Sequence, residues 1–258
     1  MIEIKDLSKS FGNKSVLEGV NLQIPDGDTI CIIGKSGSGK SVLLKHIVGL
    51  LTPDSGMVTV DGNPIEDLSR KELFALRQKI GYVFQSAALF DSYTVYENTV
   101  LSLYEHGVKD ENILEKEALR VLSAVKLLPI KENVGAAAFE KEWNILKHKK
   151  PSDLSGGMRK RVGVARALVG TPEYIFYDEP TTGLDPVTSE QIDILINDIT
   201  QELKVTSVVI THDMFSVFRI ADTVAMLHDG KVRFHGSASE LRDTKDPVVS
   251  EFLERYAH

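Results

Sequence analysis

The chain has 258 residues, of which 42% are hydrophobic and 26% are charged, and its formal net charge is −7. This composition is ordinary for a soluble globular protein, and the acidic balance argues against a nucleic-acid binder, which usually carries a basic face. No apolar run approaches the roughly 20 residues that a membrane-spanning helix needs. The first residues, MIEIKDLSKSF, carry charges where a signal peptide would be apolar, so we expect the chain to stay in the cytosol.

The N-terminal part of the chain contains three strand-like runs, at residues 2–7, 15–24 and 28–33. The turn formers Gly12–Asn13 and Asp26–Gly27 separate them. The one cysteine, Cys31, lies in the third run and cannot form an internal disulfide. We expect it to be a buried core thiol rather than a reactive one.

The segment GKSGSGKS directly follows the third run and has the spacing G-x-x-x-x-G-K-S. Glycines allow unusual backbone angles and close approach, so the loop's N–H groups can surround phosphate oxygens. A helix predicted from Val42 to Leu51 would point its positive end at the same anion. Lys40 would reach the β- and γ-phosphates, and the Ser41 hydroxyl would bind Mg²⁺. A chance glycine and serine turn is the alternative, but a strand before and a helix after favour a nucleotide site made by Gly34, Lys35, Ser36, Gly37, Ser38, Gly39, Lys40, Ser41 and Val42.

Strands and helices alternate through most of the remaining chain. Between about residues 88 and 151 strand patterns disappear and charged helical periodicity takes over, which predicts an inserted helical subdomain. The tail reads as a β-hairpin around Asp229–Gly230 followed by terminal helices at 238–258. The other predicted elements are strands at 56–60, 80–85, 174–178 and 206–211 and helices at 70–77, 155–169, 187–203 and 214–221.

The apolar strand YIFYD ends in two acids, Asp178 and Glu179. Carboxylates at the C-terminal end of a sheet strand lie where ligands bind in such folds. Asp178 would hold Mg²⁺, through water, and Glu179 would point toward the γ-phosphate as the general base that polarises water. A solvated turn or a helix cap is the alternative for two acids at a strand end, and the phosphate loop upstream argues against it.

The segment DLSGGMRKRVGVARAL predicts a second helix end that can bind an anion. Ser155 can cap the helix, and Gly156 and Gly157 expose its first backbone N–H groups. We interpret the cations of this helix as its solvated face, with a position near phosphate or a partner as the alternative; they are Arg159, Lys160, Arg161 and Arg166.

Five motifs occur in the order found in ATP-binding cassette (ABC) ATPases, which the chain resembles over nearly its whole length. They are GKSGSGKS, Gln85, LSGG, DEPTTGLD and His212. The resemblance implies an α/β fold: a P-loop NTPase core with a mainly parallel sheet, an N-terminal antiparallel β-subdomain and an inserted α-helical subdomain. Within one ABC ATPase domain, 1–258, the core would be 1–87 and 158–237, the helical subdomain 88–157 and the C-terminal helical tail 238–258.

The same resemblance implies roles for the residues that match the motifs. ATP and Mg²⁺ would be bound, with Gln85 touching Mg²⁺ and the attacking water, and His212 contacting the γ-phosphate. Two copies would pair head to tail, so that Ser155, Gly156 and Gly157 of one close over the ATP of the other, with Asp185 at the dimer seam. Phe11 would stack on adenine, although such a residue taken alone is more often part of a core.

Short stretches narrow the resemblance to the ATPases of Mce/Mla-type phospholipid transporters. These are FQSAALFD with TVYEN, SGGMRKRV, YDEPTTGLDP and DPVVSEFLERYA. Such ATPases act at the cytoplasmic face of the inner membrane, beneath integral-membrane permease subunits that exchange lipid with a periplasmic Mce-type protein. Another importer with a different cargo, for an amino acid or a metal, is one alternative. A soluble ABC ATPase of DNA repair or translation is the other, and it usually has coiled coils or two cassettes.

The separation of Gln85 from Ser155 is longer than this resemblance leads us to expect, and the excess lies in residues 135–153. This segment holds the only tryptophan, Trp143, and the basic run Lys147–Lys150. An elaborated surface helix with one apolar side packed down is the simpler interpretation. A contact to an extra subunit or to anionic lipid headgroups is the sharper hypothesis.

Overall fold

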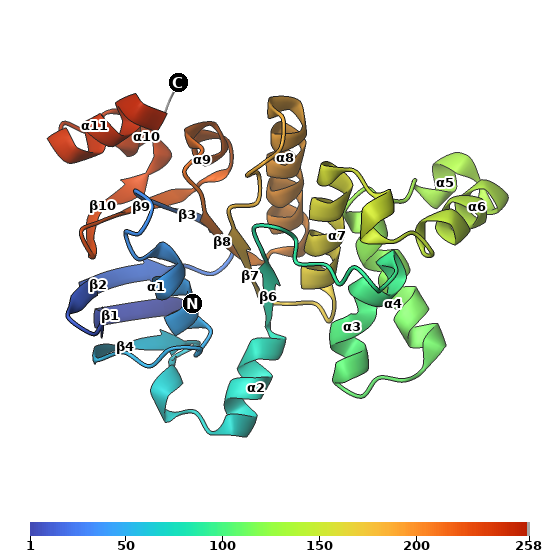
Figure 1. The fold of residues 1–258 in the computed structure, drawn as a ribbon, viewed down its shortest axis with the longest axis horizontal. Helices are drawn as coiled ribbons and strands as arrows, with labels where there is room; N and C mark the ends of the chain where they lie inside the picture. Colours follow the sequence, from blue (N-terminus) through green and yellow to red (C-terminus); the bar gives the residue numbers. More distant parts are fainter. Residues whose placement is uncertain (257–258) are drawn as a thin grey trace.

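The computed structural model describes residues 1–256, which form two sheets and their covering helices (Figure 1). The N-terminal sheet has four antiparallel strands in the order β2-β1-β4-β5. The Gly12–Asn13 turn joins its first two strands, as the sequence predicts. Its strands are β1 (Ile2–Phe11), β2 (Lys14–Ile24), β4 (Ser55–Val60) and β5 (Asn63–Pro64).

The central sheet has six strands in the order β10-β9-β3-β8-β7-β6. All neighbours pair in parallel except the terminal hairpin of β9 and β10. Because parallel strands end at the same edge, the segments that follow β3, β6, β7 and β8 meet at one place. The strands are β3 (Thr29–Ile33), β6 (Ile80–Val83), β7 (Tyr174–Asp178), β8 (Thr206–Ile210), β9 (Thr223–His228) and β10 (Lys231–Ser237).

The central sheet is buried on both faces, and successive residues of a strand belong to different cores. Ile30 and Ile32 pack with the N-terminal sheet and α1 (Lys40–Ile47), while Cys31 and Ile33 pack with the helices of the opposite face. This division follows from the two-residue period of a strand and explains why these strands read as continuous apolar runs. Cys31 is a fully buried thiol, as expected, and burial raises its pKa.

Most helices pack around the central sheet (Figure 1). Besides α1, the helices around the central sheet are α2 (Arg70–Gln78), α7 (Gly156–Leu168), α8 (Pro186–Leu203), α9 (Met214–Ile220), α10 (Ala238–Arg242) and α11 (Pro247–Tyr256), and single 3₁₀ turns lie at Ile65–Asp67 and Pro151–Asp153. Ser69 caps α2 in a capping box with Glu72, and Ser237 caps α10 in a capping box with Glu240.

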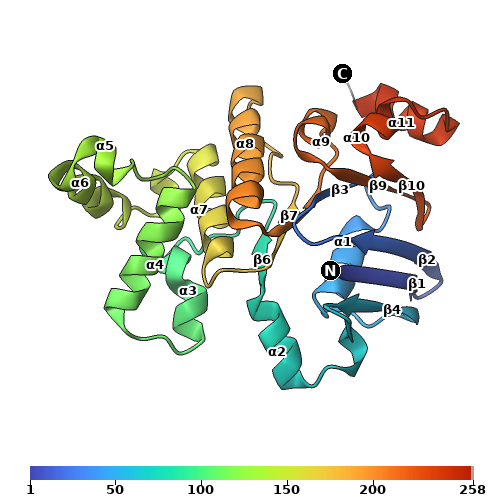
Figure 2. The ribbon, with the colours of Figure 1, turned by 180° about the vertical axis from the view of Figure 1, so that it is seen from behind.

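Four helices stand together at the end of the molecule opposite the N-terminal sheet (Figures 1 and 2). They are α3 (Val95–Glu105), α4 (Glu111–Ala124), α5 (Lys131–Val134) and α6 (Ala136–Leu146). The described residues between β6 and β7 contain no strand, which confirms the predicted switch to helices. Thr94 begins α3 with a capping box formed with Glu97.

The unusual segment 135–153 is packed down on its apolar side, as the simpler interpretation predicts. Phe139, Trp143 and Leu146 of α6 are buried in the core of the helical part. The indole Nε1 of Trp143 donates to Glu115 Oε1 at 2.8 Å, and the Lys147 ammonium lies 5.5 Å from the indole ring. Lys147 thus belongs to this packing, and the hypothesis of a lipid or subunit contact stays a prediction.

Several element ends differ from those predicted. Strand β1 runs to Phe11 instead of ending at Leu7. Helix α1 ends at Ile47 instead of Leu51, because Gly49 adopts a positive φ of 65° and turns the chain, with Gly49 N–H donating to His46 O and Leu50 N–H to Lys45 O. Strand β6 ends at Val83, where its pairing with β7 stops, so Gln85 lies beyond the strand instead of ending it.

Among the residues that the structure describes, none of the helices has both the length and the apolar character needed to cross a membrane.

Candidate nucleotide-binding site

A cavity of about 570 Å³ opens at the edge where the parallel strands end. The loop after β3 forms one wall, and residues that follow β6, β7 and β8 form the other. The structure therefore brings together motifs that are far apart in the sequence. The lining residues that the sequence predicts are Gly34, Ser36, Gly37, Gly39, Lys40, Ser41, Val42, Gln85, Asp178, Glu179 and His212.

Two glycines give the loop its path. Gly34 has a φ of 145°, and a Cβ there would lie 2.3 Å from the carbonyl oxygen of Leu227. Gly39 has a φ of 103°, and a Cβ there would lie 2.8 Å from Leu17 Cδ2. A side chain at either position would force the loop away from β9 or from β2, so only glycine fits both the angle and the space.

Lys40, the first residue of α1, is buried and faces two carboxylates. Its ammonium donates to the carbonyls of Gly34 at 2.7 Å and Lys35 at 3.1 Å, so the lysine is held within its own loop. Burial lowers the pKa of Lys40, while the charges of Glu179 and Asp178 oppose this shift. The Ser38 hydroxyl is buried in the same loop with no partner among the described residues. These features fit a loop that binds phosphate oxygens.

The two acids that follow β7 have different environments. Asp178 accepts from the Tyr82 hydroxyl at 3.3 Å, and burial raises its pKa. Glu179 has a φ of 51°, a left-handed conformation that bulky residues avoid. Its Oε2 accepts from Thr182 Oγ1 at 3.1 Å and lies 2.8 Å from His212 Nδ1. Thr182 is a contact that the sequence reasoning missed, since nothing in TTGLD marks this threonine apart from its neighbour.

Ser41, Gln85 and Asp178, the predicted metal-binding residues, line one cavity. Among the described residues no group of three or more His, Cys, Asp or Glu side chains could hold a metal ion by itself. A hydroxyl, an amide and a carboxylate are oxygen donors of the kind Mg²⁺ uses. Substrate phosphates and waters commonly complete the coordination shell of this ion. The residues therefore fit a Mg²⁺ ion that arrives with a nucleotide.

Several predicted nucleotide contacts do not line this cavity. Ser155 caps α7 by accepting from Met158 N–H at 3.2 Å. A Cβ on Gly157 would lie 2.7 Å from Thr188 Cγ2, so the LSGG turn packs against the start of α8. Asp185 caps α8 by accepting from the Thr188 hydroxyl and from Thr188 N–H, the latter at 3.0 Å, and these two hydrogen bonds lower its pKa.

Phe11, Lys35 and Ser38 also lie outside the lining of the cavity. Phe11 is 48% exposed at the end of β1, so it is not the core residue that its type alone would suggest. Lys35 takes part through its carbonyl, which accepts from Lys40, and Ser38 through the close packing of its hydroxyl against Gly34.

The sequence of the chain matches a known protein family. A sequence profile described as ABC transporter matches residues 17–182. The chain belongs to the ABC transporter family. It is therefore an ATP-hydrolysing subunit of the kind that powers membrane transport, and the predicted α/β cassette fold is confirmed.

Curated relatives match this ABC subunit over nearly its whole length. It is 36% identical over 257 residues to the intermembrane phospholipid transport system ATP-binding protein MlaF of Escherichia coli K12, covering 100% of this chain and 90% of MlaF. It is 38% identical over 252 residues to the probable ribonucleotide transport ATP-binding protein mkl of Mycobacterium leprae, covering 98% of this chain and 68% of that protein.

Solved structures agree with the fold of the ABC cassette. The ATP-binding cassette MJ0796, in a dimeric post-hydrolysis state bound to ADP and Pi, has a TM-score of 0.76 at 34% identity, covering 92% of this chain and 99% of that one. The cbiO1 subunit from Clostridium perfringens, part of the ABC transporter complex cbiONQ, has a TM-score of 0.80 at 31% identity, covering 99% of this chain and 95% of that one.

Three cations of α7, the signature helix that begins with the LSGG turn, are not a solvated face. Lys160 is buried and Arg161 and Arg166 are half-buried, so that interpretation was wrong for them, whereas Arg159 is exposed. All four donate to backbone carbonyls: Arg159 to Leu154, Arg161 to Val125, Arg166 to Ala87 and Ala88, and Lys160 to Gln85 and Glu179. Lys160 is only 6% exposed. Periodicity places charges on a helix but does not show which carbonyls a neighbouring loop presents to them.

We expect Lys40→Ala to weaken ATP binding. A charge-assisted hydrogen bond contributes about 1.5–3 kcal/mol, so the affinity should fall roughly 10- to 100-fold. Equilibrium titration with Mg-ATP measures the change, and Lys45→Ala, an exposed lysine of the same helix that does not line the cavity, is the matched control. Unchanged affinity in Lys40→Ala would contradict the assignment of the phosphate loop.

Proposed function

We propose that this ABC subunit binds Mg-ATP in the cavity and hydrolyses it with Glu179 as the general base, to drive phospholipid transport. The observation that carries the chemistry is the position of the Glu179 carboxylate. It lines the cavity with Lys40 and Ser41, and His212 Nδ1 lies 2.8 Å from its Oε2. A carboxylate in this place can accept a proton from water that attacks a phosphoryl group held by the loop.

The other residues of the cavity would orient the reactants. The amides of the loop and the Lys40 ammonium would bind the phosphate oxygens and stabilise the charge that develops on them. Ser41 and Asp178 would hold Mg²⁺ with Gln85, and the bound ion would polarise the phosphoryl oxygens. Thr182 and His212 would fix the direction of the Glu179 carboxylate, and His212 would also contact the γ-phosphate.

We propose that a second copy of the chain completes the site. The LSGG turn lies outside the cavity of its own chain, with Ser155 exposed and both glycines half-buried at the start of α7. Helix N-termini attract anions, so this end of α7 can serve a nucleotide held by another protomer. The dimeric state named for the MJ0796 cassette supports pairing of two copies. In our proposal they pair head to tail, with Asp185 at their seam.

The names of the relatives give two cargo classes, ribonucleotide for mkl and phospholipid for MlaF. We favour phospholipid because the match to MlaF spans all of this chain and 90% of MlaF. The stretches FQSAALFD, SGGMRKRV and YDEPTTGLDP, which resemble Mce/Mla-type ATPases, point the same way. An importer for another cargo would use the same cavity, so the cargo must be identified directly.

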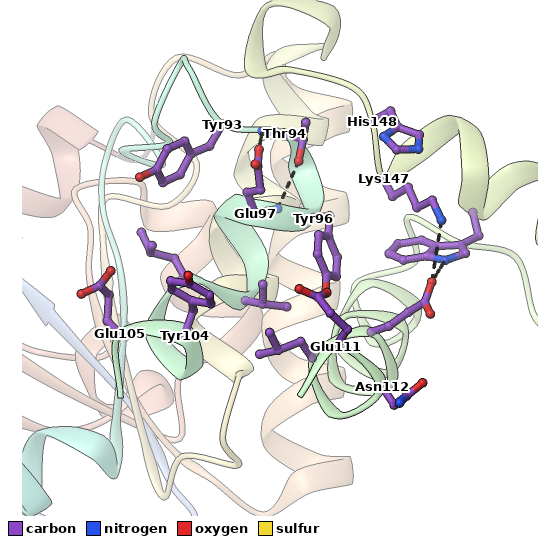
Figure 3. A pocket seen from close by; sticks show the side chains of 15 residues that line it. Tyr93, Thr94, Tyr96, Glu97, Tyr104, Glu105, Glu111, Asn112, Lys147 and His148 are labelled. Carbon is purple, nitrogen blue, oxygen red and sulfur yellow. Dashed lines mark hydrogen bonds and ion pairs between the residues drawn. The ribbon is translucent and has the colours of Figure 1, made fainter. Parts of the chain in front are cut away.

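A second cavity, of about 630 Å³, is the candidate site for the membrane permease (Figure 3). It lies between α3, α4 and α6, and its lining is mainly aromatic and acidic, with Lys147 and His148 also present. Residues 86–94 connect Gln85 to the start of α3. An occupant of this groove would therefore contact the segment that leads to the ATP site. The aromatic and acidic lining residues include Tyr93, Tyr96, Tyr104, Trp143, Glu97, Glu105, Glu111 and Glu115.

The groove suits a short amphipathic helix from a cytoplasmic loop of the permease. Tyr and Trp side chains supply large apolar surface with a polar end, and the exposed Glu105 carboxylate can pair with a basic residue of the occupant. The other carboxylates of the groove, Glu97, Glu111 and Glu115, already accept hydrogen bonds within the subunit. The subunit would then sit at the cytoplasmic face of the inner membrane, and a periplasmic Mce-type lipid-binding protein would be reached through the permease.

We expect Glu179→Gln to bind Mg-ATP with near-normal affinity and to lose turnover. General base catalysis contributes about 10²- to 10⁴-fold, so kcat should fall by that range. A steady-state assay of phosphate release gives kcat, and gel filtration with Mg-ATP shows whether the variant accumulates as an ATP-bound dimer. Turnover at the wild-type rate would refute the role of Glu179.

We expect the full-length chain to co-purify from detergent-solubilised membranes with a permease and with phospholipid. Mass spectrometry of the complex identifies both. Tyr104→Arg should reduce the recovered permease about 10-fold or more, since a buried interface tyrosine commonly contributes 2 kcal/mol or more. Ile194→Arg on α8 is the matched control, because Tyr104 is 46% and Ile194 44% exposed.

Recovery of the permease with a ribonucleotide or another small cargo would contradict the lipid assignment only. A chain that remains in the soluble fraction with no membrane partner would instead support a soluble ATPase.

A further inference from the structure

Lys160 links three motifs that lie far apart in the sequence, namely the LSGG helix, Gln85 and Glu179. It lies on the signature helix α7, and its ammonium donates both to the Gln85 carbonyl and, at 3.3 Å, to the Glu179 carbonyl. Strands β6 and β7 are parallel neighbours, and Val83 pairs with Tyr177 just before the two strands end. Gln85 and Glu179 therefore lie side by side beyond the last ladder bond, where backbone carbonyls need other donors.

We propose that Lys160 is a positioning residue that couples the signature helix to both Gln85 and Glu179, and so sets the geometry of the hydrolytic step. The inference rests on the proposed roles of these two residues. An ammonium has three N–H donors, which lets one side chain hold two carbonyls at once. Because Lys160 is 6% exposed and its bonds are charge-assisted, the link is stronger than one made in water.

The conformation of Glu179 requires such a link. Its φ of 51° places it in the left-handed region, which persists for a glutamate only when surrounding contacts hold it. Its N–H donates to Ile210 O at 2.9 Å, and its carbonyl accepts from Thr182 N–H and from Lys160, both at 3.3 Å. Lys160 is the contact that comes from the signature helix, so a shift of α7 would bear on the backbone of Glu179.

The loop that carries Gln85 is fastened to the same face of α7. Ala87 and Ala88 have φ values of 62° and 45°, and the Arg166 guanidinium donates to their carbonyls at 2.7 and 2.8 Å. Between the two cations lies Gly163, where an added Cβ would be 3.1 Å from the Cβ of Ala87. The spacing of Lys160, Gly163 and Arg166 is three residues, which keeps all three on one side of the helix.

This arrangement gives the signature helix a second task. Its N-terminus carries the LSGG turn toward the other copy of the chain, and its first turns hold Gln85 and Glu179 of its own copy. A movement of α7 when the two copies close would then reach the water-activating residues of the same chain through Lys160. Binding of nucleotide by the phosphate loop does not require this contact, because Lys160 does not line the cavity.

The test is Lys160→Met in the full-length chain, which keeps the apolar stem and removes the donors. We expect kcat for ATP hydrolysis to fall about 10- to 100-fold, because small misplacement of catalytic groups has effects of this size. The Kd for Mg-ATP should stay within about twofold, since the change removes no contact to the nucleotide. Hydrogen exchange of the amides at 86–88 should become faster, while Lys160→Arg, which keeps the donors, restores most of kcat.

Arg161→Met is the matched control. It removes a half-buried cation from the next position of α7, whose bonds go to Val125 O and Gln191 instead of the site loops. Its kcat and Kd should both stay near wild type. If Lys160→Met does not fold, Lys160→Gln takes its place, because this shorter side chain cannot hold both carbonyls.

The outcomes separate this inference from the proposed function. If Glu179→Gln keeps normal turnover, the general base assignment fails, whatever Lys160 does. If Glu179→Gln is inactive and the folded Lys160→Met or Lys160→Gln variant retains wild-type kcat, only the positioning role is overturned. An equal loss of ATP affinity and kcat in the Lys160 variant would also overturn it, because it would show a general structural defect.

Discussion

The parallel pairing of β3, β8, β7 and β6 is the constraint on which the ATP site depends. It brings the ends of four strands to one edge, and each following segment supplies a different chemical group. The segment after β3 supplies backbone amides and Lys40, those after β7 and β8 supply Glu179 and His212, and the loop after β6 supplies Gln85. If one of these strands were paired in the opposite direction, its following segment would leave the sheet at the other edge, and its group could not act on the same phosphate.

The central sheet can place these groups accurately because it is covered on both faces. One face is closed by α1 and the N-terminal sheet, and the other by α7, α8 and α9. Close packing leaves the strand ends little freedom, so the flexible part of the site is confined to the loops beyond them. In the loops after β6 and β7 the left-handed residues Ala87, Ala88 and Glu179 are stabilised by bonds from α7, which turns the signature helix into a support for the catalytic edge.

Under the proposed function, the two cavities of this ABC subunit have different roles, since one would bind the nucleotide and the other would dock the permease. The nucleotide cavity lies on the sheet edge, and the aromatic groove lies among α3, α4 and α6. The segment after Gln85 connects them through the start of α3, and α7 packs against both parts. The unusual α6 segment contributes to the packing of the helical part, because Trp143 is buried against α4 and hydrogen-bonded to Glu115.

The sequence by itself determined the phosphate loop, the acids after β7, the cap at Ser155, and the switch from strands to helices. These features depend on local spacing and on the period of apolar residues, which a linear chain displays directly. Only the tertiary structure decided that the cations of α7 bind backbone carbonyls, that Thr182 and His212 share the Glu179 carboxylate, and that Phe11 is exposed at the end of β1 and does not line the cavity. Such contacts depend on which loops a packed helix or strand end meets, and no local pattern encodes that.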